Sequence, residues 1–416
     1  MTKAAGGRIV LPESEKDPRP ADNGLLPDPE PRARHYTVIS VDDHVVEPRH
    51  MFEGRIEKRF QSQAPRIVET PEGHELWEYD GRRFPQLGLN AVVGRRDREK
   101  WTFEPTRFDQ MRPGCYDIHA RIKDMDLNGV WASVNFPSQL SSFCGAVFSS
   151  TRDPDLGQAV MRAWNDWLFE EWYRSYPERI VPMGITWLAD PLVGAEEVER
   201  NAERGFTAVT LPERPHALGY PSLHSGWWDP LIGACERTDT VICLHVGSSG
   251  GLPMAEDAPQ LELGATLFPA LSLHACADWL WSGVPVRFPK IRIAMSEGGI
   301  GWVPMLLDRL DYMMATSGHG RTGWMSRDLS PSEVVRRNFW FCTIDDESTL
   351  GCLDRIGIDN VMVEVDYPHA DSTWPDTQDF LTRRLRGLPE EVVRKVTHES
   401  AARLFRHPLP AGGTLT

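Results

Sequence analysis

Short runs of apolar and β-branched residues recur along the chain from residue 36 onward. Runs with apolar residues at consecutive positions are typical of strands buried on both faces, as in parallel sheets. They predict strands at Val38–Val41, Val130–Phe136, Ile180–Thr186, Phe206–Leu211, Val241–Val246, Ile291–Met295, Phe339–Ile344 and Val361–Val365.

Between these runs, apolar residues return at the i, i+3 and i+4 spacing of helices that bury one face. Examples of the predicted helices are Leu156–Tyr173, Val193–Glu203, Trp228–Thr238, Phe268–Gly283, Trp302–Met314 and Thr377–Gly387. Alternating strands and helices indicate a parallel sheet, and eight repeats predict closure into a barrel. The predicted fold class is therefore α/β, a (β/α)8 barrel of the TIM type.

The spacing of the runs divides the chain. Residues 1–35 are rich in proline and charged residues and predict an extended or disordered arm. The barrel is expected to span residues 36–408, followed by a tail at 409–416. The long connection after the first strand predicts a lid-like insertion at 45–125 that folds over the barrel mouth, although a decoration far from the mouth would fit as well.

The net charge and the cysteine spacing disfavour several kinds of partner and favour a reducing compartment. A net charge of −15 argues against nucleic acid and against an anionic membrane surface as partners. No apolar leader or membrane-length run is visible. The seven scattered cysteines never form a CxxC pair, which favours buried free thiols in a reducing cytoplasm. We expect a cytoplasmic enzyme with a small-molecule substrate, assembled as a homo-oligomer.

Five metal-binding side chains follow four of the predicted strands. In a (β/α)8 barrel, residues just past the strands face one shared mouth, where the chemistry takes place. A carboxylate or histidine at one strand end is usually a capping or packing residue, but this shared placement predicts a metal site. The residues are Asp42, His44, His245, Glu297 and Asp366.

The chemistry of these groups suits one or two divalent metal ions. Asp42 and His44 are two residues apart and so project from the same side of an extended segment. The mixed nitrogen and oxygen set favours iron or zinc, with manganese as a further option, over calcium. Such an ion lowers the pKa of bound water to about 7 and supplies a nucleophile.

Three residues are expected to take part directly in catalysis. Glu297 precedes a glycine-rich turn and could bridge a second ion, act as a general acid or base, or hold a water molecule beside the metal ligands, and Asp366 is both a ligand and a catalytic candidate. His369 follows Pro368 and either folds back over the metal or caps its loop. Glu47 is a further candidate ligand, although a solvated loop glutamate fits its position equally well.

Several enzyme classes lack their motifs here. The chain has no GxSxG elbow, and no GxGxxG or phosphate-binding loop follows a strand. No lysine stands at a strand end, so a carbamylated lysine cannot bridge two ions. A serine hydrolase, a kinase and a nicotinamide enzyme are therefore disfavoured.

At its strand ends the chain resembles the amidohydrolase superfamily, in the branch with aminocarboxymuconate semialdehyde and resorcylate decarboxylases. The segments that carry this resemblance run from about Val38 to Phe405. The resemblance implies a (β/α)8 barrel with metal ligands after the first, fifth and eighth strands. The motifs are Val-Asp-Asp-His-Val-Val-Glu-Pro at 41–48, Leu-His-Val-Gly-Ser-Ser at 244–249, Ser-Glu-Gly-Gly-Ile-Gly-Trp at 296–302 and Asp-Tyr-Pro-His-Ala-Asp-Ser-Thr-Trp-Pro at 366–375.

The chain departs from that branch in two places. Many relatives carry His-x-His where this chain has Asp42-x-His44, and decarboxylating relatives carry a proton-handling histidine where this chain has Glu297. The added carboxylates also resemble the non-haem di-iron site of an amidohydrolase-type monooxygenase in platensimycin biosynthesis.

The leading functional hypothesis is hydrolysis of a carbon–heteroatom bond by metal-activated water. A di-iron monooxygenase acting on an apolar substrate is the first alternative, and a metal-dependent decarboxylase is the second. A barrel that binds without catalysing would also retain metal. Fifteen tryptophans, including Trp187, Trp302 and Trp374 near the expected mouth, favour an apolar or aromatic substrate.

Overall fold

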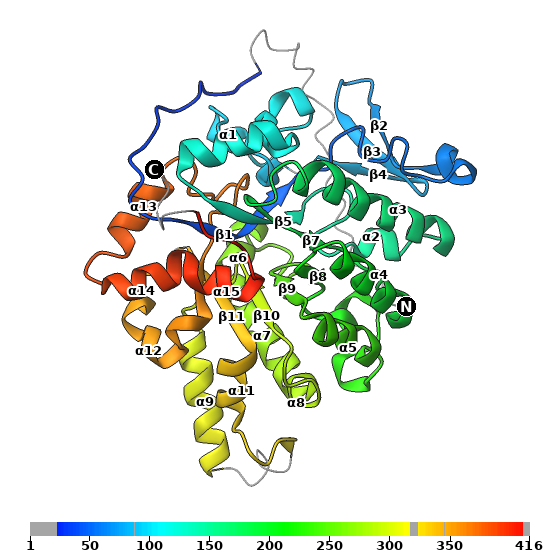
Figure 1. The fold of residues 1–416 in the computed structure, drawn as a ribbon. Coiled ribbons are helices and arrows are strands. Elements are labelled where there is room, and N and C mark those ends of the chain that lie inside the picture. The colour runs from blue at the N-terminus through cyan, green and yellow to red at the C-terminus, as the bar shows by residue number, and fades with distance from the viewer. Residues whose placement is uncertain (1–22, 87, 317–322, 345, 411–416) are drawn as a thin grey trace.

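A ring of parallel strands forms the centre of the molecule (Figure 1). The structure is a computed structural model that describes residues 23–86, 88–316, 323–344 and 346–410. The strands of the ring are β1 Ile39–Val45, β5 Ala132–Pro137, β6 Ile180–Val181, β7 Met183–Gly184, β8 Ala208–Leu211, β9 Val241–His245, β10 Ile293–Ser296, β11 Phe339–Thr343 and β12 Val361–Val363.

The strands pair in chain order. One set runs β1-β5-β6 and the other β7-β8-β9-β10-β11-β12, every pair parallel. Pro182 separates β6 from β7, because proline has no N–H for the ladder. Near β12 the ring closes on β1, where Asp366 N donates to Asp42 O (2.8 Å) and His44 N to Tyr367 O (2.6 Å). The predicted (β/α)8 barrel is confirmed.

Helices surround the ring, and aspartates begin several of them. Asp117, Asp153 and Asp190 each accept hydrogen bonds from backbone N–H groups of the first turn, as N-cap residues do. The helices are α1 Ile118–Asn128, α2 Ala146–Ser149, α3 Pro154–Trp167, α4 Pro191–Glu203, α5 Asp229–Thr238, α6 Gln260–Thr266, α7 Phe268–Trp281, α8 Val284–Arg287, α9 Val303–Thr316, α11 Pro331–Asn338, α12 Leu353–Ile356, α13 Thr377–Arg384, α14 Glu390–Arg394 and α15 Ser400–Phe405.

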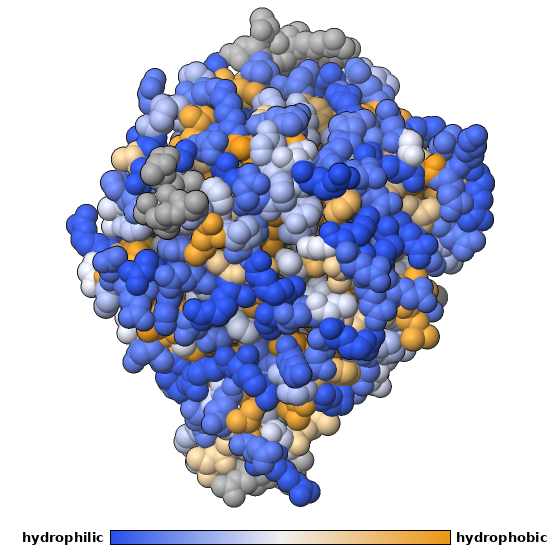
Figure 2. All heavy atoms as spheres, viewed as in Figure 1, coloured by the Kyte–Doolittle hydropathy of each residue, from blue (hydrophilic) through white to orange (hydrophobic). Residues whose placement is uncertain are grey.

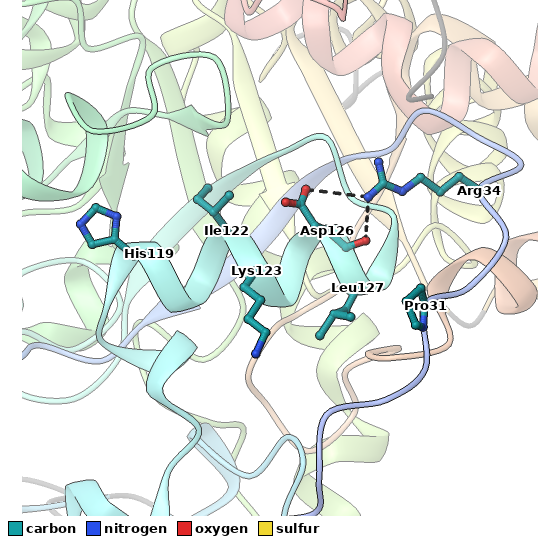
Figure 3. A pocket seen from close by; sticks show the side chains of 7 residues that line it. All are labelled: Pro31, Arg34, His119, Ile122, Lys123, Asp126 and Leu127. Atoms are coloured by element: carbon teal, nitrogen blue, oxygen red, sulfur yellow. Dashed lines mark hydrogen bonds and ion pairs between the residues drawn. The ribbon is translucent and has the colours of Figure 1, made fainter.

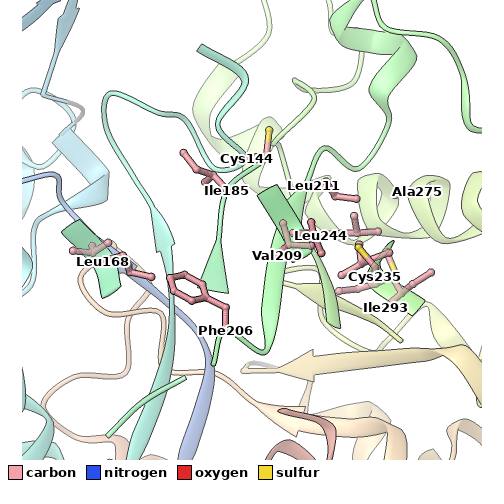
Figure 4. Packing of buried hydrophobic residues seen from close by; sticks show 14 of the residues in the cluster. Cys144, Leu168, Ile185, Phe206, Val209, Leu211, Cys235, Leu244, Ala275 and Ile293 are labelled. Atoms are coloured by element: carbon pink, nitrogen blue, oxygen red, sulfur yellow. The ribbon is translucent and has the colours of Figure 1, made fainter. Parts of the chain in front are cut away.

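The core has two layers. Inside the ring, alternate strand residues such as Val41, Cys243 and Met362 pack against one another. Outside it, the opposite faces of the strands pack against the helices, and Figure 4 shows this layer around β8, β9, α5 and α7. The strands are thus buried on both faces, which explains why their sequences are continuously apolar.

The connection after β1 differs from the predicted insertion. It contains a small antiparallel sheet, β2 Arg66–Glu69, β3 Glu75–Tyr79 and β4 Arg82–Pro85, which lies at the edge of the molecule in Figure 1. Nearer the barrel mouth, Val92 N and Val93 N donate to Pro368 O at 3.0 and 3.3 Å. One part of the connection is therefore peripheral, and another part contacts the loop that carries Asp366 and His369.

The first barrel helix lies inside the range predicted for the insertion. The apolar pattern of the sequence does not predict helix α1, because the inward face of this helix carries the charged residues Arg121 and Asp124, which are 0% and 2% exposed. Arg121 donates to Gly114 O at 2.7 Å and to His44 O. The insertion proper therefore ends before Ile118.

The described part of the N-terminal arm runs in an extended path against the barrel. Arg34 donates to Asp126 O at 2.9 Å, and Figure 3 shows Pro31 and Arg34 facing helix α1 across a shallow pocket. Arg32 pairs with Asp376 at 2.6 Å. These contacts attach residues 23–36 to their own chain. Most of the predicted arm, residues 1–22, and most of the predicted tail, residues 411–416, lie outside the described residues.

The visible surface is mainly hydrophilic, and most of the cysteines are buried. The face shown in Figure 2 is mainly hydrophilic, with apolar residues scattered over it. All seven cysteines are free thiols, and all are buried except Cys352. None of the helices in the described ranges is long and apolar enough to cross a membrane.

Candidate metal centre

The barrel brings the five predicted side chains to one place. Asp42 and His44 lie on β1, where a register shift between Ser40 and Asp43 interrupts the ladder. His245 ends β9, Glu297 directly follows β10, and Asp366 lies three residues beyond β12. All five side chains are buried or nearly so.

The ligand atoms converge closely. His44 Nε2 lies 3.4 Å from Asp42 Oδ1, 3.3 Å from Asp366 Oδ1 and 3.0 Å from His245 Nε2. His245 Nε2 lies 3.2 Å from Glu297 Oε2. Two nitrogens that bind one ion at right angles, each at about 2.1 Å, are about 3.0 Å apart, so the two imidazoles have the spacing of ligands to a shared ion.

The backbone fixes which ring nitrogen of His245 faces the centre. Nδ1 lies 2.7 Å from Val246 O, which can only accept, so Nδ1 carries the proton. Nε2 of the neutral ring therefore presents its lone pair to the cluster. Burial and the neighbouring His369 lower the pKa of His245 to about 3, which keeps the ring uncharged at neutral pH.

Two carboxylates of the cluster have no hydrogen-bond donor in the described part of the chain. Both side-chain oxygens of Asp42 and of Asp366 are buried without a hydrogen-bond donor among the described residues. Burial, reinforced by neighbouring carboxylates, raises the pKa of Asp42, Asp366 and Glu297 well above the usual range. A divalent cation would satisfy these oxygens and offset the repulsion, so the donor set fits such an ion.

His369 and Asp371 extend the cluster toward the mouth. His369 stacks on the His44 ring with centroids 3.6 Å apart, and its Nδ1 lies 3.1 Å from Asp366 Oδ1. Ligand atoms of Glu297, Asp366, His369 and the exposed Asp371 all lie within 4.8 Å of one another. His369 thus folds back over the cluster rather than only capping its loop.

A strained turn aims Glu297 at the cluster. Glu297 has φ 61° and Asp366 has φ 56°, in a left-handed region that side chains disfavour. Glycine suits the next position, because a Cβ on Gly298 would lie 1.9 Å from Ser272 Oγ and the neighbouring atoms would have to move. Two carboxylates hold this turn: Glu364 accepts from Glu297 N at 3.1 Å, and Asp346 accepts from Gly301 N at 3.0 Å.

Glu47 lies outside the cluster. Its buried carboxylate accepts hydrogen bonds from the backbone N–H groups of Gln139, Leu140 and Ser141 and from the Ser141 hydroxyl. With its oxygens occupied in this way, Glu47 orders the loop after β5. Glu47 is therefore neither a metal ligand of this cluster nor a solvated loop glutamate, the two roles that its sequence position allowed.

The structure adds residues that the sequence reasoning missed. Phe143 stacks on His245 at 4.2 Å and meets His44 edge-on at 5.2 Å, so an aromatic ring covers the two histidines. Cys342 and Glu364 lie beside Asp42 in the barrel interior. Glu364 could have been found, because it stands two residues before Asp366 and period-two alternation points both the same way. Nothing in the sequence marks Phe143.

The three tryptophans expected near the mouth serve in packing. Trp187 is 3% exposed, and the Trp302 indole donates to Gly298 O at 3.0 Å, supporting the Glu297 turn. The indole of Trp374 donates to Asp124 O at 3.2 Å. Among the described residues, the aromatic side chains that contact the two cluster histidines are therefore Phe143 and Phe136, and not a tryptophan.

Solved structures share this fold over nearly the whole chain. An amidohydrolase from Mycobacterium avium subsp. paratuberculosis is 22% identical, with a TM-score of 0.67 over 90% of this chain and 100% of its own. A 5-carboxyvanillate decarboxylase from Sphingomonas paucimobilis is 20% identical, with a TM-score of 0.61 over 89% and 99%. A 2,6-dihydroxybenzoate decarboxylase from Rhizobium is 16% identical, with a TM-score of 0.57 over 89% and 99%. At these identities the likeness establishes the barrel fold.

A family model described as Amidohydrolase matches residues 106–407, well over half of the chain. The match begins after β1, so Asp42 and His44 lie outside it, although β1 completes the barrel and brings both into the cluster. The predicted resemblance begins at about residue 38. Before residue 106 it is supported by the shared fold, and from residue 106 onward it is also supported by the sequence match. The chain belongs to the amidohydrolase superfamily.

Proposed function

We propose that this protein is a metal-dependent hydrolase that cleaves a carbon–heteroatom bond in a small, largely apolar substrate. Asp42, His44, His245 and Asp366 would hold the metal. A divalent ion held there would supply a Lewis acid for a carbonyl group and would lower the pKa of bound water to about 7. The observation that carries the proposal is the convergence of ligand atoms from β1, β9, β10 and β12, among which both oxygens of Asp42 and of Asp366 are buried without a donor among the described residues.

Glu297 is the proton-handling group in this proposal. Its carboxyl reaches the cluster at His245, 3.2 Å away, and it is one of the few cluster groups that retain some exposure to the mouth. Burial and neighbouring carboxylates raise its pKa well above that of a free glutamate, which favours a carboxyl that can hold a proton. In its ionised form beside a bound cation, Glu297 would accept a proton from the attacking water and return it to the leaving group.

The remaining groups shape the substrate site. Phe143 lies over His44 and His245 and offers an apolar, aromatic surface next to the cluster. Asp371 and His369 line the mouth and can accept or donate hydrogen bonds. We expect aromatic acids, esters or amides as substrates, because a flat apolar surface with a few polar groups suits them.

Decarboxylation is the second candidate. A structural neighbour from Novosphingobium aromaticivorans, 18% identical with a TM-score of 0.62, is a 5-carboxyvanillate decarboxylase solved with bound manganese. The raised pKa of Glu297 also supports this reaction, because a protonated carboxyl could deliver a proton to the carbon that loses carbon dioxide. Glu297 would then replace the histidine of the decarboxylating relatives.

The test is to compare the wild-type protein with Glu297→Gln on a panel of aromatic esters, amides and hydroxybenzoates. We expect turnover of an ester or amide by the wild type and a loss of about 100-fold or more in the variant, with normal folding and metal content. Glu262→Gln, on the exposed face of α6, is the matched control and should keep full activity. Release of carbon dioxide without ester or amide cleavage would replace hydrolysis by decarboxylation.

Metal analysis separates these reactions from oxygenation. Two irons per chain together with oxygen consumption would favour the di-iron monooxygenase alternative, whereas zinc or manganese without oxygen consumption would favour hydrolysis or decarboxylation. A fully active Glu297→Gln protein would refute the role given to Glu297 in either reaction.

A further inference from the structure

A second group of ligand atoms lies inside the barrel, next to the metal centre. Cys342 on β11 and Glu364, directly after β12, both point into the ring. Cys342 Sγ, a Glu364 carboxylate oxygen and an Asp42 carboxylate oxygen all lie within 4.8 Å of one another. The three side chains are 0%, 3% and 0% exposed.

This inner group is short of hydrogen-bond donors. Glu364 Oε2 accepts from the Cys342 thiol and from Glu297 N, but Glu364 Oε1 and both oxygens of Asp42 have no donor within the described part of the chain. A buried polar atom without a partner costs about 1–3 kcal/mol, and more when it is charged. Glu364 Oε1 is thus a buried oxygen without a donor among the described residues, in a group whose ligand atoms lie close enough together to share one ion.

Four acidic side chains crowd the two groups without a cationic neighbour among the described residues. Asp42, Glu297, Glu364 and Asp366 are buried or nearly so, and no lysine or arginine of the described residues forms an ion pair with any of them. A second divalent ion is the kind of group that would satisfy the acidic oxygens of the inner group.

We propose that Asp42, Cys342 and Glu364 form an inner site for a second divalent transition-metal ion, with Asp42 shared between the two positions. A thiolate beside two carboxylates suits zinc, ferrous iron or cobalt and disfavours magnesium or calcium. On binding, the ion replaces the thiol proton, which passes to solvent, and no electron is transferred. This inference rests on the proposed metal centre, with which it shares Asp42, but not on the reaction catalysed there.

The competing explanation is purely structural. The Cys342 and Glu364 pair contacts the backbone N–H of Glu297 and could serve only to hold its strained turn. In that case, the environment of the Cys342 sulfur would not change when metal is added. The two explanations therefore differ in whether the sulfur bonds to metal.

Cobalt titration of the metal-free protein separates them. We expect two equivalents of cobalt(II) to bind, with a thiolate-to-cobalt charge-transfer band in the near ultraviolet. Cys342→Ser should lose this band and one equivalent of cobalt but retain the other. Cys243→Ser is the matched control, because Cys243 is also a buried thiol of the barrel interior, and it should keep both.

X-ray absorption of the wild-type protein loaded with zinc needs no variant. A sulfur scatterer at about 2.3 Å is the expected result. Binding of a single cobalt with only nitrogen and oxygen ligands would overturn the inner site while leaving the proposed centre intact. A charge-transfer band that persists in Cys342→Ser would overturn the assignment to Cys342, and no cobalt binding at all would overturn both sites.

Discussion

At the scale of single residues, buried carboxylates that have no hydrogen-bond donor in the described ranges indicate a bound metal ion. Asp42 and Asp366 are 0% exposed and have no donor to either oxygen among the described residues. Such groups are rarely kept for stability alone, because a buried unpaired carboxylate is strongly unfavourable. Their presence at two strand ends of one barrel is the strongest residue-level argument for a bound cation.

Glu213, which follows β8, should make stability depend on pH. Burial raises its pKa to about 7, although Arg214 and the backbone amides of Gly247 and Ser249 partly oppose this. Between pH 4.5 and pH 7 the folded protein keeps a proton on Glu213 that the unfolded chain releases. The free energy of unfolding therefore falls as pH rises from about 4.5 to 7.

Denaturant titrations of metal-free protein at pH 5 and pH 8 measure the effect. The wild type should lose about 2–3 kcal/mol relative to Glu213→Gln over this interval. The buried histidines cancel in this difference, because both proteins contain them. A difference that stays constant with pH would show that Glu213 titrates normally.

Glu47 tests the distinction between a ligand and a structural carboxylate. Glu47→Ala removes the acceptor of several backbone N–H groups in the 139–141 loop and should lower the free energy of unfolding by about 3 kcal/mol. Its metal content should equal that of the wild type. Glu53→Ala, in an exposed position of the same connection, should change neither quantity. Loss of metal with unchanged stability would restore Glu47 as a ligand.

At the scale of elements, the strands were predictable and their connections were not. Runs such as Val241–Val246 are apolar throughout because β9 is buried on both faces, so the strand and its terminal His245 could be recognised. Helix α1 could not, because Arg121 and Asp124 occupy its inward face. The role of Glu47 is not predictable for a related reason, because its partners are backbone amides of residues 139–141, which no sequence pattern reveals.

The turn after β10 is the element most constrained by close packing. Gly298→Ala would place a Cβ 1.9 Å from Ser272 Oγ on α7, so the turn and helix would have to separate. We expect a loss of about 1–3 kcal/mol in the free energy of unfolding, measured by chemical denaturation. Gly251→Ala is the control, because nothing lies within 4 Å of its added Cβ. Equal stabilities of the two variants would show that the turn relaxes freely.

At the scale of the whole molecule, the barrel fold brings residues that are far apart in the sequence together in one site. Asp42 and Asp366 are joined through the backbone hydrogen bond that helps close the ring, at 2.8 Å. The sequence indicated this convergence because residues past parallel strands share one mouth. It could not indicate the depth of the site, since nothing in the sequence marks Cys342 of β11 as a neighbour of Asp42. The homo-oligomer stays a prediction, to be measured by light scattering.

Metal content is the measurement that tests the central claim most directly. Elemental analysis of protein purified without added metal should find at least one equivalent of iron, zinc or manganese per chain. His245→Ala should lose most of it, because the variant removes a nitrogen from the middle of the cluster. His274→Ala, at an exposed position of α7, should retain it. Full metal content in His245→Ala, or no bound metal in the wild type, would contradict the assignment of this metal centre.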